Sequence, residues 1–264
     1  MGQIEDGLGR SLITVEEAKE KGFAEPQDVF CEWCGEPLEQ RGIVFGGRVA
    51  WIAHENCGCE GERAARAAAE RAADDEKRLQ EEKNLERAGI GKRFLQAKVD
   101  GKECENFIRR FGSDEGRGLY IHGGVGTGKT YTASALAREF VDSGYAVVLT
   151  TTLSMLEDIQ DTYGKEASSL EAVSRFSKCD VLILDDLGKE SASAWSISML
   201  FQIIDVRYEA MRPLIVTTQY DYVGLERRLS RQGEAQSAKA IVSRLREMCR
   251  PMQLRGGDRR LTAM

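Results

Sequence analysis

The sequence is poor in proline and has no long apolar run. Only 4 of its 264 residues are proline, and this composition argues against a long disordered arm. No apolar stretch approaches the ~20 residues that a helix needs to cross a bilayer, and residues 1–28 lack the apolar core of a signal peptide. These absences argue against a membrane or secreted protein and predict a cytoplasmic one.

Length and charge indicate several compositional zones. A chain of 264 residues predicts one or two domains, with one sizeable core and a small additional module. Its net charge of −6 is unevenly divided, because residues 1–60 hold 5 basic and 12 acidic side chains and residues 221–264 hold 10 and 5. A basic segment can indicate nucleic-acid binding, but arginine is also common on helix faces. The net charge therefore decides no partner.

Four of the seven cysteines form two close pairs near the amino end. Cys31 and Cys34 are a C-x₂-C pair, and Cys57 and Cys59 follow as a C-x-C pair. Four thiolates in two pairs suit tetrahedral Zn²⁺, in a closed site that is structural rather than catalytic. His54 is an alternative fourth ligand. The second pair has only one residue between its cysteines, so its two thiolates are more constrained in binding one ion than those of the C-x₂-C pair. We expect all four cysteines to bind zinc.

A highly charged segment follows the cysteines. Residues 61–88 consist almost only of Ala, Glu, Arg, Lys, Asp and Gln, which favours a helix. The segment has no sustained heptad of apolar residues, so it is expected to be a solvated spacer rather than a coiled coil. The sequence thus divides into a zinc-binding domain at 1–60, a helical linker at 61–98 and a larger domain at 99–264.

The larger domain alternates between strand and helix patterns. Short apolar runs occur at 119–122, 146–149, 181–184 and 214–217, and residues 133–141 between two of them have helical periodicity. Such alternation is typical of an α/β domain whose central parallel sheet is covered by helices on both faces.

Residues 123–130, GGVGTGKT, match the pattern G-x-x-x-x-G-K-[ST] at every fixed position. A strand is expected before them and a helix after them, which is the context of a phosphate-binding P-loop. Backbone N–H groups and the helix dipole would hold a polyphosphate, the lysine would reach the β- and γ-phosphates, and the threonine would bind Mg²⁺. The expected ATP-binding residues are Gly124, Val125, Gly126, Thr127, Gly128, Lys129, Thr130 and Tyr131.

Acidic residues follow the apolar run at 181–184. Asp185 is expected to join Thr130 at the Mg²⁺, and Asp186 to orient or deprotonate the attacking water. The run at 214–217 leads to Gln219, whose amide is expected to sense the γ-phosphate or hold the water. Many ATP-hydrolysing proteins have a glutamate at the position of Asp186, so the shorter side chain leaves the hydrolysis rate open.

These motifs resemble those of the DnaC-type helicase loaders and their IstB-type transposition relatives. The resemblance lies in 118–130 (GLYIHGGVGTGKT), 182–190 (LILDDLGKE), 204–208 (IDVRY) and 212–218 (RPLIVTT), and it covers roughly residues 90–261. It implies an AAA+ P-loop ATPase that binds ATP between neighbouring subunits. Gln219 departs from the asparagine usual at this position in the family.

Further roles are implied by the resemblance alone. Residues 240–246 are similar to the segment that carries the trans-acting arginine of the family, which we assign to Arg244, with Arg246 as the alternative. Residues 150–156 resemble a loop and helix entry that lines a single-stranded DNA path, although an ordinary helix N-cap has the same sequence pattern. The cysteine-bearing front end matches phage and Gram-positive loader-like versions, whose front domain docks on the helicase.

The sequence therefore predicts an ATPase with ATP, Mg²⁺ and Zn²⁺ as cofactors. Its expected function is to load a DnaB-type replicative helicase onto single-stranded DNA, with self-association through the ATPase domain. One alternative is an IstB-like transposition helper, which would bind duplex DNA and a transposase. The other is a weakly hydrolysing, ATP-switched adaptor.

Overall fold

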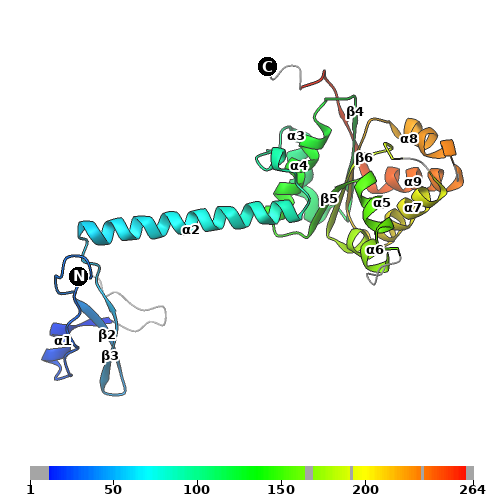
Figure 1. Ribbon diagram of the computed structural model, residues 1–264. Helices are drawn as coiled ribbons and strands as arrows, with labels where there is room; N and C mark the ends of the chain where they lie inside the picture. The colour runs from blue at the N-terminus through cyan, green and yellow to red at the C-terminus, as the bar shows by residue number, and fades with distance from the viewer. Residues whose placement is uncertain (1–11, 164–168, 191–192, 233–234, 260–264) are drawn as a thin grey trace. The chain divides into compact units, whose positions relative to one another are not determined.

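The computed structural model describes residues 12–163, 169–190, 193–232 and 235–259 and divides into two compact units. Unit 1 is Met1–Leu79 and unit 2 is Gln80–Met264 (Figure 1). No helix among the described residues is long and apolar enough to span a bilayer.

Unit 1 is built on a small antiparallel sheet with the order β1-β2-β3. Its strands are β1 (Leu12–Thr14), β2 (Gln40–Phe45) and β3 (Arg48–His54), and the short helix α1 (Val15–Glu20) follows β1. Gly46 and Gly47 both have positive φ, as the tight turn between β2 and β3 requires. The segment between α1 and β2 carries the first cysteine pair.

Helix α2 (Glu60–Arg87) follows the second cysteine pair and is the 28-residue helix that the charged composition predicts. The boundary between the two units falls within it, after Leu79, whereas the predicted linker ends at residue 98. The reason is that Leu85, Ala88, Ile90 and Ala97 are buried, and three of them join the core of unit 2. Residues 61–84 have the charged composition of a solvated helix, whereas the last part of the predicted linker, from Leu85 on, contains the apolar residues that pack in unit 2.

Unit 2 contains a five-stranded parallel sheet with the order β5-β6-β7-β4-β8. The strands are β4 (Gly118–Gly123), β5 (Val147–Thr151), β6 (Val181–Leu187), β7 (Leu214–Thr218) and β8 (Cys249–Leu254). β4, β6 and β7 contain predicted apolar runs, and β5 begins one residue into its run, at Val147. β8 was not predicted, because Arg250 and Pro251 interrupt its apolar pattern; proline is tolerated there since β8 is an edge strand.

Helices cover both faces of this sheet (Figure 1). One core contains Leu119, Ile183 and Ile215 together with residues of α3 (Lys102–Arg110) and α4 (Lys129–Asp142). The other core contains Leu182, Leu184 and Val216 and is covered by the remaining helices. These are α5 (Thr152–Gln160), α6 (Ser169–Lys178), α7 (Ala194–Glu209), α8 (Tyr222–Leu229) and α9 (Ala235–Met248); the 3₁₀ turns are η1 (Lys92–Phe94), η2 (Phe111–Ser113) and η3 (Ser230–Gln232). The predicted α/β fold with a helix-covered parallel sheet is confirmed.

Parallel pairing brings the carboxyl ends of the strands to one edge of the sheet. Thr151 of β5 pairs with Asp185 of β6, while Gly123 of β4 pairs with Leu254 of β8. The residues that follow these strands therefore meet at this edge, where ligands bind in open α/β sheets.

Candidate nucleotide site and cysteine cluster

The glycine-rich loop connects β4 to α4. Gly126 has φ +76° and Gly128, the N-cap of α4, has φ +96°, a conformation that side chains other than glycine adopt at a cost. Thr127 is buried, and its hydroxyl donates to the carbonyl of Gly124 at 3.0 Å. This bond closes the loop from within. The loop leads into the amino terminus of α4, and helix amino termini favour anions.

Lys129 is the first residue of α4 and is buried against the loop. Its Nζ donates to the carbonyl oxygens of Gly123 at 2.9 Å and of Gly124 at 2.7 Å. The ammonium group thus lies across the mouth of the loop, where a bound phosphate would exchange these carbonyl contacts for an ionic one.

Thr130 and Asp185 come together across the sheet edge. The Thr130 hydroxyl donates to Asp185 Oδ2 at 2.8 Å, and the Thr217 hydroxyl donates to Asp185 Oδ1. Burial raises the pKa of Asp185, while these two hydrogen bonds oppose the shift. A hydroxyl and a carboxylate in contact are oxygen donors of the kind that Mg²⁺ prefers, so the pair fits the metal that accompanies a nucleotide.

Asp186, one residue before the end of β6, has an unusual backbone conformation. It has φ +61°, and the register between β6 and β7 shifts between Leu184 and Leu187. The Asp186 N–H donates to Thr217 Oγ1 at 3.0 Å, and its carboxylate accepts from Lys189 Nζ at 2.6 Å. The irregular backbone gives the two successive carboxylates different surroundings. Asp185 is buried, whereas Asp186 is half-buried at the surface of a cavity.

The cavity has a volume of about 580 Å³ and adjoins the loop. Of the predicted nucleotide-binding residues, Gly124 and Thr127 are not part of its lining; Thr127 instead holds the loop from inside. Gln219, which follows β7, lines the cavity, and its contact with the γ-phosphate or the attacking water stays a prediction. The complete lining is Arg93, Phe94, Val125, Gly126, Gly128, Lys129, Thr130, Tyr131, Asp186, Lys189, Gln219 and Arg259.

The cavity is also lined by four residues that the sequence motifs do not identify as site residues: Arg93, Phe94, Lys189 and Arg259. At one end of the cavity the ring of Phe94 lies edge-on to that of Tyr131, with centroids 6.5 Å apart. The Tyr131 hydroxyl accepts a hydrogen bond from the N–H of Lys98 at 3.1 Å. An aromatic pair beside a phosphate-binding loop can contact the base of a nucleotide. The signal for it was the apolar Phe94 among charged residues just before the domain.

The predicted arginine finger is engaged inside its own molecule. Arg244 of α9 donates from Nε to Asp205 Oδ1 of α7 at 2.7 Å, and its guanidinium lies 4.7 Å from the ring centre of Phe201. Arg246 is exposed and lies 5.3 Å from the ring centre of Tyr222. Neither arginine lines the described cavity of this molecule, and the role of Arg244 at a neighbour's site stays a prediction.

The segment at 150–156 forms the junction between β5 and α5. Thr151 is the N-cap of α5, and its hydroxyl oxygen accepts from the N–H of Ser154 at 3.0 Å. Thr152 is buried, whereas Leu153 is exposed. The N-cap arrangement named as the alternative is thus present, and a contact with DNA at this position stays a prediction.

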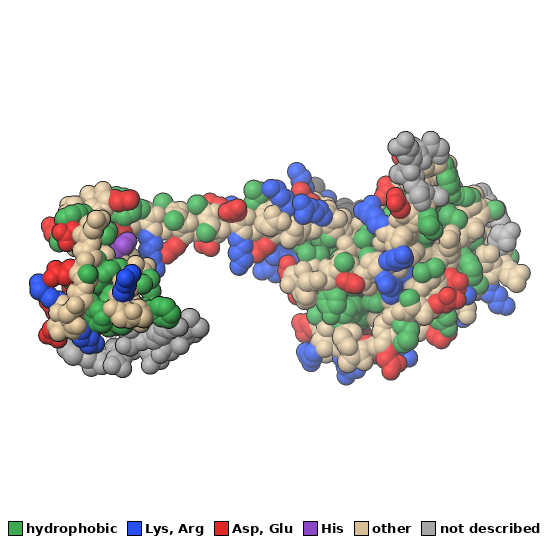
Figure 2. Space-filling model, turned by 90° about the horizontal axis from the view of Figure 1, so that it is seen from below, with side chains coloured by type: hydrophobic (Ala, Val, Ile, Leu, Met, Phe, Trp, Pro, Cys, Tyr) green, Lys and Arg blue, Asp and Glu red, His purple; other side chains and the backbone are tan. Residues whose placement is uncertain are grey.

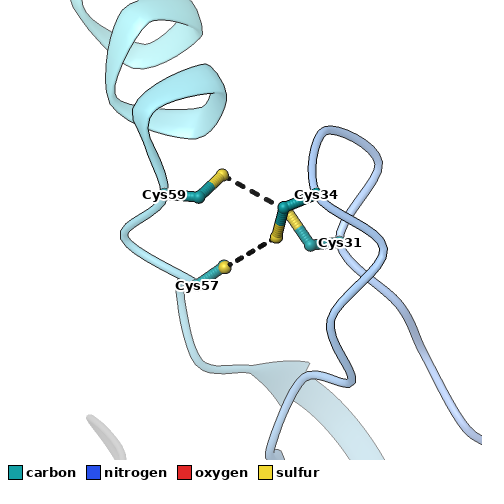
Figure 3. A group of neighbouring side chains, drawn as sticks. All are labelled: Cys31, Cys34, Cys57 and Cys59. Atoms are coloured by element: carbon teal, nitrogen blue, oxygen red, sulfur yellow. Dashed lines mark hydrogen bonds between the residues drawn. The ribbon is translucent and has the colours of Figure 1, made fainter.

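The four cysteines of unit 1 converge on one point (Figure 3). Their Sγ atoms lie within 4.8 Å of one another, and none forms a disulfide. The Sγ atoms of Cys34 and Cys57 are 3.2 Å apart, and those of Cys31 and Cys59 are 3.7 Å apart. Hydrogen bonds from the backbone of Cys34 and Trp33 lower the pKa of Cys31 to about 7, whereas the hydrogen bond with the Cys34 thiol raises the pKa of Cys57 to about 12. Zinc binding would therefore have to be accompanied by proton release from the cluster. His54 is not a member of this described group; it ends β3.

The sheet order, the loop and the acidic strand end define an ATP-binding protein with the AAA+ P-loop fold. The family model of the IstB-like ATP-binding proteins matches residues 89–263. The chain therefore belongs to this family.

Named relatives connect the family to helicase loading. The chain is 24% identical over 161 residues to the replicative helicase loader DnaI of Bacillus subtilis, in an alignment that covers 59% of this chain and 51% of DnaI. The first curated relatives are matched over about half of their length or less.

Solved structures of helicase loaders share the fold. A crystal structure of DnaI is 25% identical with a TM-score of 0.54 and covers 64% of this chain and 94% of that one. A crystal structure of the DnaC helicase loader is 25% identical with a TM-score of 0.52 and covers 62% and 100%. The predicted resemblance to DnaC-type loaders and IstB-type relatives is confirmed.

Proposed function

We propose that this protein is an ATP-dependent loader of a DnaB-type replicative helicase onto single-stranded DNA. The observation that carries the proposal is the combination of two parts in one chain: a cavity lined by the glycine-rich loop and a separate unit with a four-cysteine cluster. The relatives named as helicase loaders support the same conclusion.

In this proposal the cavity binds ATP and hydrolyses it. Lys129 and the loop N–H groups hold the phosphates, and Thr130 and Asp185 hold the Mg²⁺. Asp186 orients the attacking water, because its carboxylate lies at the cavity surface, and Gln219 contacts the γ-phosphate. Magnesium supplies charge neutralisation at the phosphates when it is bound.

Hydrolysis would be completed by a second copy of the chain. An arginine from a neighbour stabilises the charge that develops during phosphoryl transfer. Arg244 is our choice, since it belongs to the segment that resembles the family's finger. To reach a neighbour's phosphate, its side chain has to leave Asp205, so subunit association and ATP binding would be linked through this ion pair.

Unit 1 would dock on the helicase. Zinc held by the four cysteines, Cys31, Cys34, Cys57 and Cys59, would hold the two segments that carry them together. These segments lie next to a groove of about 680 Å³. Phe30 and Trp33 are more than half exposed at this groove, and hydrophobic side chains gather on this unit among charged ones (Figure 2). Because residues 1–60 are strongly acidic, we expect a partner surface that is apolar with basic residues around it.

A binding assay with a purified DnaB-type helicase tests the proposal. The full chain should form a complex whose stability changes with ATP, and Trp33→Ala should weaken it while ATP binding stays at the wild-type level. Ile52→Ala, which removes another exposed apolar side chain of unit 1 that does not line this groove, is the matched control. If no ATP-sensitive complex forms, the loader proposal is wrong.

The family match favours one second candidate, a transposition helper of the IstB type. A helper would prefer duplex DNA, whereas a loader would prefer single-stranded DNA through residues 150–156. Titrating the ATP-bound protein with both forms of DNA separates the two functions. ATP binding without turnover, with or without single-stranded DNA, would instead identify an ATP-switched adaptor.

A further inference from the structure

The turn that follows β6 brings a lysine to the nucleotide cavity. Lys189 lies three residues after Asp186, and both residues line the cavity. The Lys189 Nζ donates to Asp186 Oδ2 at 2.6 Å. The lysine side chain is 52% exposed and the aspartate side chain 25% exposed. The carboxylate that we propose to orient the attacking water is therefore paired with an ammonium group at the cavity surface.

The backbone of this turn is held without the lysine side chain. The Lys189 N–H donates to the Asp186 carbonyl at 3.2 Å. The Gly188 N–H donates at 2.9 Å to the carboxylate of Glu190, which is 2% exposed. Arg228 of α8 donates to the carbonyls of Gly188 at 2.8 Å and of Glu190 at 2.7 Å. These bonds fix the turn from its buried side, so the turn places the Lys189 side chain and does not depend on it.

Orientation is a particular demand on the Asp186 side chain. Its φ of +61° fixes the direction in which the side chain leaves the backbone, but the carboxylate can still rotate. A charge-assisted hydrogen bond to one carboxylate oxygen restricts this rotation. With Oδ2 engaged by Lys189, Oδ1 is the oxygen that would accept from the attacking water. A half-exposed ion pair adds little to folding stability, so its effect should appear in the reaction rate.

We propose that Lys189 is a positioning residue for ATP hydrolysis, which holds the Asp186 carboxylate in the orientation that receives the attacking water. This inference deepens the proposed function and rests on its ATP site. Lys189 acts through Asp186, whereas Lys129 would contact the phosphates directly. A positioning lysine matters only while the Asp186 carboxylate is present. A phosphate-binding lysine would contribute whether or not that carboxylate is there.

The test is a double-mutant cycle, measured by single-turnover hydrolysis on the full chain with Mg²⁺. Lys189→Met keeps most of the side chain but removes the charge, and it should lower the rate about 10- to 100-fold, as misplacement of a reacting group does. Lys189→Arg keeps the charge and should recover most of the rate. In the Asp186→Asn background, Lys189→Met should lower the rate by less than about threefold, because the carboxylate that it positions is already lost.

Two further measurements separate positioning from phosphate binding and from packing. Calorimetry should give Lys189→Met an ATP affinity within about fivefold of the wild type, because the charge is half exposed and screened by water. Thermal melting without nucleotide should match the wild type, since the bonds of the turn do not use the lysine side chain. Lys178→Met, which removes an exposed lysine outside the cavity lining, is the matched control and should leave all three measurements unchanged.

Several results would overturn the inference. Wild-type or faster hydrolysis in Lys189→Met would show that the ion pair does not assist the reaction. An equal loss of rate with and without the Asp186 carboxylate, or a loss of ATP affinity as large as the loss of rate, would make Lys189 a phosphate-binding residue instead. Equal losses in Lys189→Arg and Lys189→Met would assign the effect to shape.

Failure of the proposed function gives a different pattern. The wild-type protein would then hydrolyse no ATP, or Asp186→Asn would hydrolyse it at the wild-type rate, and the inference would fall with the function. A loss of rate in Asp186→Asn without any loss in Lys189→Met would overturn the inference alone.

Discussion

Arg244 donates from Nε to Asp205 Oδ1 at 2.7 Å within one molecule. The same guanidinium lies over the rings of Phe201 and Tyr208, with distances of 4.7 and 5.4 Å to the ring centres. Its side chain is therefore held by charge and by aromatic contact before any neighbour is present. Arg244 would act in trans only when its interaction with a neighbour's phosphate is more favourable in free energy than its contacts with Asp205, Phe201 and Tyr208 of α7.

The first prediction concerns turnover in the assembled state. Arg244→Ala should leave the ATP affinity of the isolated chain near the wild-type value, because Arg244 does not line its own cavity. It should lower ATP turnover of the assembly by about 10³-fold or more, the usual contribution of an arginine finger. Turnover measured against protein concentration checks this. Arg246→Ala tests the alternative finger. Loss of turnover in Arg246→Ala alone would move the assignment to Arg246, and an equal loss in both variants would contradict it.

The second prediction concerns zinc and its ligand set. The purified chain should bind one zinc ion per molecule; Cys59→Ser should lose it, and His54→Ala should keep it, because His54 is not a member of the described four-cysteine group. A strong chelator should remove hydrogen-exchange protection from residues 12–59 and leave the α/β unit protected. Zinc release can be followed with a colorimetric indicator. Retention of zinc by Cys59→Ser together with its loss from His54→Ala would reverse the ligand assignment.

Much of the nucleotide site could be predicted from sequence because its motifs are local. The loop needs only eight adjacent residues, and Asp185 follows directly from a four-residue apolar run. Arg259 could not be predicted in the same way. Its position depends on the pairing of β8 with β4, which lie more than a hundred residues apart in the sequence. β8 itself is hard to predict, because Arg250 and Pro251 interrupt its apolar pattern.

The remaining differences have the same physical origin. The sequence pattern of residues 61–98 predicts a continuous spacer, but its apolar positions become visible as core only once α4 and the sheet are present. Phe94 lines the cavity next to Tyr131. This contact joins residues 37 positions apart, so a motif with fixed local spacing does not predict it. The ion pair between Arg244 and Asp205 joins α9 to α7. It forms only when these two helices pack together, so the sequence alone does not show that the proposed finger is already paired.

The third prediction concerns a fully buried arginine. Arg207 of α7 is 0% exposed, and its guanidinium donates to backbone carbonyls that end α6 and precede β6 and β7. Arg207→Ala would leave several buried carbonyls without a donor and should cost at least ~3 kcal/mol of unfolding free energy. Urea denaturation measures it. Arg175→Ala, which removes an exposed arginine, should change stability by no more than ~0.5 kcal/mol; similar losses in the two variants would contradict the argument.

The fourth prediction uses the left-handed backbone of Asp186. Asparagine tolerates a φ of +61°, so Asp186→Asn should fold and bind ATP like the wild type. It should lose about 10²- to 10⁴-fold in turnover, because the amide cannot accept a proton from the attacking water. Asp186→Ala should show an additional stability loss of about 1 kcal/mol from backbone strain. Single-turnover hydrolysis with unchanged rate in Asp186→Asn would remove Asp186 from the reaction.

The last prediction concerns the buried carboxyl group of Glu190. Glu190 is 2% exposed, and one of its oxygens accepts from the N–H of Gly188 at 2.9 Å while Oε1 has no partner in the described part of the chain. Burial raises the pKa of Glu190, although the nearby Arg228 and the backbone N–H groups oppose the shift. The folded state therefore retains the proton to a higher pH than the unfolded chain does.

Because the folded state binds this proton more tightly, ionisation of Glu190 should reduce stability as pH rises from the ordinary glutamate range, about 4.3, through the raised pKa. Glu190→Gln cannot ionise, so its unfolding free energy should exceed that of the wild type most at neutral pH and match it in acid. Asp185 contributes a slope of the same sign in both proteins, and the difference between them isolates Glu190. The exposed Glu157→Gln should follow the wild-type profile. A constant offset between Glu190→Gln and the wild type at every pH would show that packing, not charge, determines the effect.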